Sequence, residues 1–238
     1  MTEAEWLTSD DVIKMYAVPT PMHSVPQSKA RLSRRVASLF AIACVRATPQ
    51  AEDQTFLKNA ESVVEVAIES GQWGEVDALY EIAGERCNEV ALRSTEHQWA
   101  LAALRLTDDT IDCYAFHVPL FILKALAGTG SLADLRHNYA DSLRDVVGNP
   151  FRGGRAKRMK QPQIVHPSPV IRNLWRTSTV LSLAQHIYDS RDFSTMPILA
   201  DALQDEGCDS DDIPNHCRNA NGVHVRGCWV VDHILGKT

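Results

Sequence analysis

The sequence predicts an all-α fold, a multi-helix bundle completed by a compact helical C-terminal subdomain. Apolar residues recur at intervals of three and four along nearly the whole chain, which is the spacing of one helix face. No run of four to eight residues alternates between apolar and polar, as a half-buried strand would. The 238 residues are 45% hydrophobic and 23% charged. This is an ordinary composition for a soluble globular chain, and a chain of this length buries a core without a disulfide or metal.

Two helices are predicted before residue 50. Ser9 can cap a short first helix, because its hydroxyl accepts a free N–H of the first turn, and Pro19 ends that helix. A longer helix covers residues 28–46, with apolar positions at intervals of three and four. Arg34 and Arg35 are expected to face outward from it.

A third helix is predicted over residues 51–70, and Gly71 follows it as a residue suited to the left-handed conformation after a helix end. Glu61, Glu65 and Glu69 fall at i, i+4 and i+8 on one face of this helix. Di-iron helix bundles also use glutamates that project from one helix face, but they add a Glu-x-x-His motif, which does not accompany these three residues. They are therefore expected to form a solvent-exposed stripe.

A pair of helices comes next. Residues 73–93 carry apolar positions at helical spacing, and Thr95 with Gln98 resembles a capping box that opens a helix through residue 104. We expect these two helices to pack antiparallel.

Two further helices complete the predicted bundle. Pro119 interrupts the apolar residues of 109–126, so a kink or break is predicted near His117. Ser131 can cap a last helix over 131–147, which Gly148 ends.

Residues 149–174 are predicted to be a loop, because they hold four Pro, two adjacent Gly and no acidic residue. The chain is thus divided into an N-terminal helical bundle (1–148), this basic loop (149–174) and a C-terminal helical subdomain packed on the bundle (175–238). Shorter helices are predicted in the last part at 177–189, 197–206, 211–218 and 225–235. Pro197 and Pro214 suit the first position of a helix.

The basic loop suggests one functional hypothesis. Its cationic side chains could follow a phosphate backbone or dock on an acidic protein face. Aromatic residues are sparse there, which disfavours stacking on single-stranded bases. The net charge of −6 also argues against a nucleic-acid binder that uses its whole surface. The candidate contact residues are Arg152, Arg155, Lys157, Arg158 and Lys160.

A second hypothesis is a metal site in the C-terminal region, where Cys and His are dense. Thiolate and imidazole ligands suit zinc or another transition metal. The spacing is not that of a zinc finger, and a packed, metal-free cluster is the favoured alternative. His224 and Cys228 would share a helix face if the last helix began early enough. The candidate ligands are Cys208, His216, Cys217, His224 and Cys228.

A third hypothesis is nucleophilic catalysis by Cys228, or alternatively Cys217, beside a histidine such as His224, with Asp232 as an orienting carboxylate. No GxSxG or cysteine-enzyme signature accompanies these residues, and catalytic groups usually come from distant segments. An ion pair between Arg226 and Asp232 that holds the last helix on the bundle is the interpretation we favour.

Several segments resemble one protein family. They are GNPFR (148–152), LAQHIYDSRDFSTMPILADALQDEGC (183–208), IPNHCR (213–218) and HVRGCWVVDHILGK (224–237). The chain resembles a family of uncharacterised planctomycete proteins in which this tail follows a helical N-terminal part. The resemblance implies no activity. The chain departs from the family pattern between residues 153 and 171, where the family usually has a shorter stretch.

The sequence predicts a cytoplasmic protein that does not enter a membrane. The first twenty residues lack the apolar stretch of a secretory signal, and the longest apolar run, 36–45, is half of what a membrane span needs. The six cysteines form no CxxC pair, which fits a reducing compartment. The favoured function is a helical interaction or regulatory module with a protein partner, and the alternatives are a metal-binding protein or enzyme and a nucleic-acid-associated protein.

Overall fold

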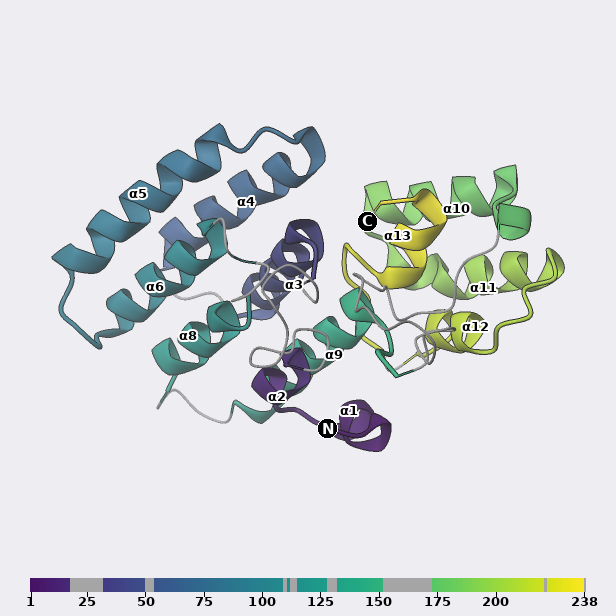
Figure 1. The fold of residues 1–238 in the computed structure, drawn as a ribbon, viewed down its shortest axis with the longest axis horizontal. Helices are drawn as coiled ribbons and strands as arrows, with labels where there is room; N and C mark the ends of the chain where they lie inside the picture. The colour runs from purple at the N-terminus through teal and green to yellow at the C-terminus, as the bar shows by residue number, and fades with distance from the viewer. Residues whose placement is uncertain are drawn as a thin grey trace, which may run out of the picture.

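The protein is described by a computed structural model covering residues 1–17, 32–49, 54–108, 111, 115–127, 132–151, 173–220 and 222–237. Within these residues every regular element is a helix and no strand is present (Figure 1). The prediction of an all-α, multi-helix fold is therefore confirmed. The basic residues Arg152, Arg155, Lys157, Arg158 and Lys160 lie outside the described residues.

The N-terminal half is built from eight described helices. α6 packs against α4, α5 and α8, while α3 packs against α4, α8 and α9 (Figure 1). In chain order these helices are α1 (Glu3–Thr8), α2 (Val12–Tyr16), α3 (Arg34–Ala47), α4 (Thr55–Ser70), α5 (Gly74–Glu89), α6 (Thr95–Thr107), α8 (His117–Ala125) and α9 (Ala133–Val147).

The first three helices start differently from the prediction, and α3 begins at Arg34, after its cap Ser33, rather than at residue 28. α1 was not expected, yet it has a complete capping box, in which Thr2 accepts from the Glu5 amide and Glu5 accepts from the Thr2 amide. α2 is capped by Asp11 rather than Ser9, because the carboxylate of Asp11 accepts from the Lys14 amide. Ser9 instead accepts from the Asp11 amide.

Other helix ends follow the sequence closely. α4 ends at Gly71 and α9 at Gly148, both with positive φ, as predicted. The cap of α6 is Ser94, one residue before the predicted Thr95. The break near His117 is also confirmed, since α8 begins there and Pro119 falls in its first turn, where a missing N–H leaves no hydrogen bond unmade.

In the described part of the C-terminal half there are four α-helices and two 3₁₀ turns. They are η3 (Asn173–Trp175), α10 (Ser178–Ser190), η4 (Phe193–Thr195), α11 (Met196–Asp205), α12 (Asp212–Cys217) and α13 (Trp229–Leu235). The last helix begins later than the predicted residue 225. Gly227 has φ +98° and Cys228 has ψ 123°, so the chain is not helical before Trp229. Pro197 lies in the first turn of α11, and Pro214 is the third residue of α12.

Buried apolar side chains form two clusters. The larger one runs from Trp6 to Val147 and belongs to the helical bundle, and the smaller one runs from Trp175 to Ile234. Val225 packs on the larger cluster although it lies in the C-terminal half. The three-part domain division stays a prediction, but the segment around Val225 joins the two cores.

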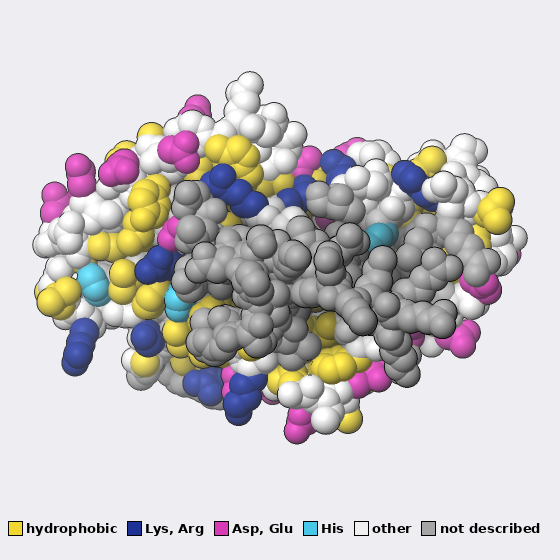
Figure 2. Space-filling view, in the orientation of Figure 1, with side chains coloured by type: hydrophobic (Ala, Val, Ile, Leu, Met, Phe, Trp, Pro, Cys, Tyr) yellow, Lys and Arg dark blue, Asp and Glu magenta, His cyan; other side chains and the backbone are white. Residues whose placement is uncertain are grey.

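The outer face of α5 is acidic. Figure 2 shows acidic side chains along the edge of the molecule where α5 lies in Figure 1. They are exposed and belong to Glu75, Asp77, Glu81, Glu85 and Glu89. This face lies away from the junction of the two cores, where the buried polar side chains with metal-binding atoms are found.

Candidate metal centre

Four side chains with metal-binding atoms meet where α9 of the bundle faces the C-terminal half. Asp145 lies in the last turn of α9 and His216 in the last turn of α12. His224 lies in the loop between α12 and α13, and Cys228 is the residue before the first turn of α13. One atom from each of the four can be chosen so that all lie within 4.8 Å of one another.

The contacts converge on one carboxylate oxygen. Oδ1 of Asp145 lies 3.0 Å from His216 Nε2 and 2.8 Å from His224 Nδ1. His216 Nε2 also lies 3.2 Å from the Cys228 sulfur. The second oxygen of Asp145 accepts the Val225 amide at 2.8 Å, which fixes the carboxylate in place.

This geometry differs from that of a catalytic triad. In a Cys-His-Asp triad, one imidazole nitrogen faces the thiol and the other faces the carboxylate. Here a single nitrogen, Nε2 of His216, faces both Cys228 and Asp145. Atoms that all face one point can surround a cation, whereas they cannot pass a proton along a line.

Burial sets the ionisation of the cluster. Burial, together with the charge of Asp145, raises the pKa of Cys228 well above its ordinary value. Burial also acts to raise the pKa of Asp145, but hydrogen bonds from His216 and His224 outweigh it, and the net pKa is lowered. Asp145 is thus a carboxylate, while Cys228 without a metal is a thiol and a poor nucleophile.

The structure brings together three of the five predicted ligands, namely His216, His224 and Cys228. Cys217 is buried in the smaller core, and burial with the nearby Asp145 raises its pKa to about 12. The Cys208 sulfur lies 3.8 Å from the Ser210 carbonyl oxygen. No disulfide forms among the described cysteines.

The catalytic grouping of Cys228, His224 and Asp232 is not assembled. Both carboxylate oxygens of Asp232 accept from Arg35, at 3.1 and 3.3 Å. Arg226 pairs with Glu65 at 3.0 Å rather than with Asp232. The sequence was right that an ion pair anchors the last helix, but the cation comes from α3.

Sequence reasoning missed Asp145, the residue on which the cluster is centred. It lies 79 positions before His224, so local spacing gives no sign of it. A weak signal is present in α9, where Asp145 follows the buried Ser142 by three positions and precedes the buried Val146. An acid at the border of an apolar face indicates a buried polar partner.

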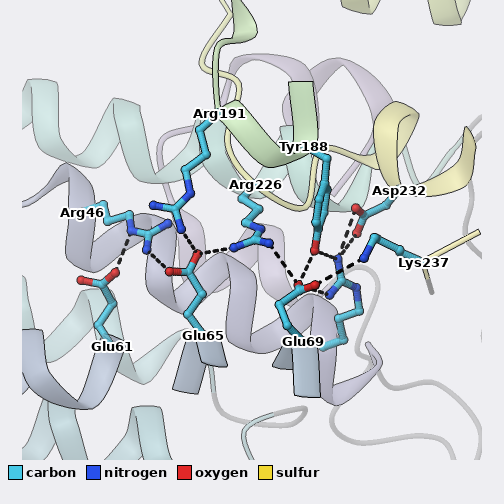
Figure 3. Close-up of polar contacts among 10 residues, drawn as sticks. Arg46, Glu61, Glu65, Glu69, Tyr188, Arg191, Arg226, Asp232 and Lys237 are labelled. Atoms are coloured by element: carbon cyan, nitrogen blue, oxygen red, sulfur yellow. Dashed lines mark hydrogen bonds and ion pairs between the residues drawn. The ribbon is translucent and has the colours of Figure 1, made fainter. Parts of the chain in front are cut away.

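A second polar cluster, which we call the junction ion network, joins side chains of α3 and α4 to side chains of the C-terminal half (Figure 3). Glu65 of α4 is paired with three guanidinium groups, from Arg46 at 2.6 Å, Arg191 at 2.7 Å and Arg226 at 3.0 Å. Burial acts to raise the pKa of Glu65, but hydrogen bonds from Arg46 and Arg226 bring it down to about 2.

The neighbouring carboxylates extend the network in both directions. Glu61 pairs with Arg46, and Glu69 pairs with Arg35, Arg226 and Lys237 and accepts from the Tyr188 hydroxyl. The expected solvent-exposed stripe is therefore wrong: Glu61, Glu65 and Glu69 are only 9%, 13% and 31% exposed. Their partners come mostly from the C-terminal half, which the pattern within α4 does not show. Arg35 also faces inward, contrary to expectation.

No protein-family model matches the chain, and no curated protein or solved structure shows significant similarity to it. Among the helices of the described ranges, none has the length and apolar character needed to cross a bilayer.

Proposed function

We propose that this protein binds a transition-metal ion, with zinc as the best-suited ion, through Asp145, His216, His224 and Cys228. The observation that carries the proposal is the convergence of one oxygen, two imidazole nitrogens and one sulfur within 4.8 Å of one another. This donor set contains the three ligand types that zinc uses in proteins. Four donors around one point match its tetrahedral preference.

The site fits a structural metal better than a catalytic one. Structural zinc sites use four protein ligands, whereas catalytic sites use three and keep one position for water or substrate. Here four protein donors are available, and Asp145 and Cys228 are almost wholly buried, at 1% and 0% exposure. A metal would also replace the proton that burial and the charge of Asp145 keep on the Cys228 thiol.

The position of the ligands gives the metal its role. Asp145 belongs to α9 of the bundle, and the other three ligands belong to the C-terminal half. A metal held by all four would link segments far apart in the chain, as structural metals do in domains with a small core. The smaller cluster, Trp175 to Ile234, is the part that gains most from this link.

The test is metal analysis of protein purified without chelator or affinity metal. We expect about one zinc per chain. Replacement by Co²⁺ should give the intense visible absorption of tetrahedral coordination and a thiolate-to-metal band in the near ultraviolet. Cys228→Ser should remove the thiolate band, and Asp145→Ala should weaken metal binding at least ~10-fold.

Cys217→Ala is the matched control, because Cys217 follows His216 and is buried but lies outside the four-residue group. Its Co²⁺ spectrum should equal that of the unmodified protein. Metal-free protein with no Co²⁺ spectrum, or a thiolate band lost in Cys217→Ala and kept in Cys228→Ser, would overturn the proposal.

The other functional hypotheses concern partners. The interaction or regulatory role with a protein partner stays a prediction from the sequence. Nucleic-acid contact by the segment from Arg152 to Lys160 also stays a prediction, because that segment lies outside the described residues.

A further inference from the structure

A pocket of about 340 Å³ lies between the bundle and the C-terminal half, beside the candidate metal centre. One wall comes from α3 and includes Leu39, Ile42 and Ala47. The opposite wall includes Phe193 of η4 and Val225 of the loop before α13. The volume falls at the lower end of the range of small-molecule sites, and the wall is mainly apolar, as such sites usually are.

The charged residues of the pocket wall all carry positive charge. Arg46, Arg191 and Arg226 line it, and no Asp or Glu is among its described lining residues. Figure 3 shows that these three side chains converge on Glu65 from three different segments. The carboxylate holds the guanidinium groups in fixed positions without itself lining the pocket.

Arg191 is placed there by an unusual backbone conformation. It ends α10 with φ +58°, a left-handed conformation that usually calls for glycine or asparagine. An arginine at this position contributes a side chain that glycine lacks. Arg191 is 45% exposed and uses one nitrogen on Glu65. A guanidinium has five N–H donors, so donors remain for a ligand.

We propose that this pocket binds a small organic monocarboxylate with a short apolar chain. Guanidinium groups match a carboxylate in shape and charge, and they hold it best when they are already fixed in place. The partly exposed apolar side chains of Ala47, Phe193 and Val225 would cover the chain. A bare inorganic anion would leave these side chains in contact with water, so it fits less well.

The inference goes beyond the proposed metal site and does not require it. The pocket shares only His224 with the four-residue group, and its cations belong to the junction ion network. The two proposals therefore fail in different measurements: the metal site in metal content, and the pocket in ligand binding.

The test is calorimetric titration of the full-length protein with hexanoate, with acetate and 1-hexanol as probes of the charge and the chain alone. Metal content is measured on the same samples. We expect hexanoate to bind at least tenfold more tightly than acetate or 1-hexanol. Arg191→Gln should weaken hexanoate binding at least fivefold without changing metal content, because Arg191 is not in the metal group. Ala47→Leu, which adds bulk to the apolar wall, should weaken hexanoate binding to a similar or greater extent.

Arg136→Gln is the matched control, because it removes an arginine that lines a different pocket, near α2 and α8. It should leave hexanoate binding unchanged. Absence of hexanoate binding, equal binding of hexanoate and 1-hexanol, or an Arg191→Gln affinity equal to that of Arg136→Gln would each overturn the proposal, whatever the metal content.

Discussion

Asp145 is the residue on which the candidate metal centre depends most, because it is an almost wholly buried carboxylate with three hydrogen-bond donors around it. Two imidazole rings contact its Oδ1, and the Val225 amide contacts its Oδ2. A buried charge of this kind is tolerated only when its partners are complete. Removing the charge should therefore leave the rings and the amide poorly matched.

We expect Asp145→Asn to destabilise the metal-free protein by about 2–4 kcal/mol, since an amide has only one accepting oxygen: its NH₂ group must face either the two rings or the Val225 amide, and it cannot accept from any of them. Urea unfolding at pH 7 with a chelator present would measure this. Asp205→Asn, at the exposed end of α11, is the control and should change stability by less than about 0.5 kcal/mol. Equal effects of the two substitutions would show that the Asp145 contacts do not stabilise the fold.

At this scale, the sequence indicated the residue types of the site but not its full membership. His216, His224 and Cys228 lie within a span of 13 residues, so their density could be seen directly. Asp145 approaches them only through the packing of α9 against the C-terminal half. Such a contact depends on tertiary structure, which the spacing of residues along the chain does not specify.

The loop before α13 is the element that brings the site together. It places His224 and Val225 against Asp145, and then reverses direction at Gly227. Gly227 has φ +98°, and a Cβ atom there would lie 2.9 Å from Cδ1 of Leu39 on α3. Both the conformation and the close approach require glycine.

Gly227→Ala should therefore destabilise the protein by about 2–4 kcal/mol, by adding a steric clash to the backbone strain. Gly71→Ala is the control, because Gly71 has φ +72° but a Cβ atom there would meet nothing within 4 Å. Gly71→Ala should lower the free energy of unfolding by only about 1 kcal/mol. Thermal or urea unfolding measures both. If Leu39→Ala failed to relieve any part of the Gly227→Ala effect, the clash with Leu39 would not be its cause.

The helix ends marked by glycine were predicted correctly, whereas helix starts were predicted less well, even where a local signal such as the Thr2–Glu5 capping box of α1 is present. Gly71 and Gly148 end α4 and α9 as expected, because glycine favours the required conformation in any context. The start of α13 was predicted four residues too early. The apolar spacing continues through Val225, but that residue packs on the bundle core from a loop.

The junction ion network joins the two halves of the molecule by charge, in addition to the apolar packing of Val225. α4 contributes Glu65 and Glu69, which Arg191, Arg226 and Lys237 reach from the C-terminal half. The all-α class could be predicted from periodicity, which is local. The pairing of these groups could not, because opposite charges at a distance in sequence have many alternative partners.

The network makes a prediction about the acid stability of the whole molecule. The pKa of Glu65 is lowered to about 2 in the folded protein, from 4.5, because arginine hydrogen bonds outweigh the effect of burial. A lowered folded-state pKa means that the stabilisation is complete well above pH 4.5 and is lost as the pH falls toward 2. Glu65→Gln should thus be less stable than the unmodified protein by about 2–3 kcal/mol at pH 7, a value that already allows for partial screening of the charges by solvent.

The decisive measurement is the stability difference between the unmodified protein and Glu65→Gln as a function of pH. It should be constant from pH 7 to about 5.5 and should shrink steadily from about pH 5 to about pH 3, since the unfolded chain takes up a proton in that range before the folded chain does. Glu81→Gln, on the exposed acidic face of α5, is the control and should show almost no difference at any pH. A Glu65→Gln difference that stayed constant down to about pH 3 would mean that the guanidinium groups do not hold the charged form of Glu65. The junction would then be maintained by apolar contacts such as that of Val225, rather than by ion pairs.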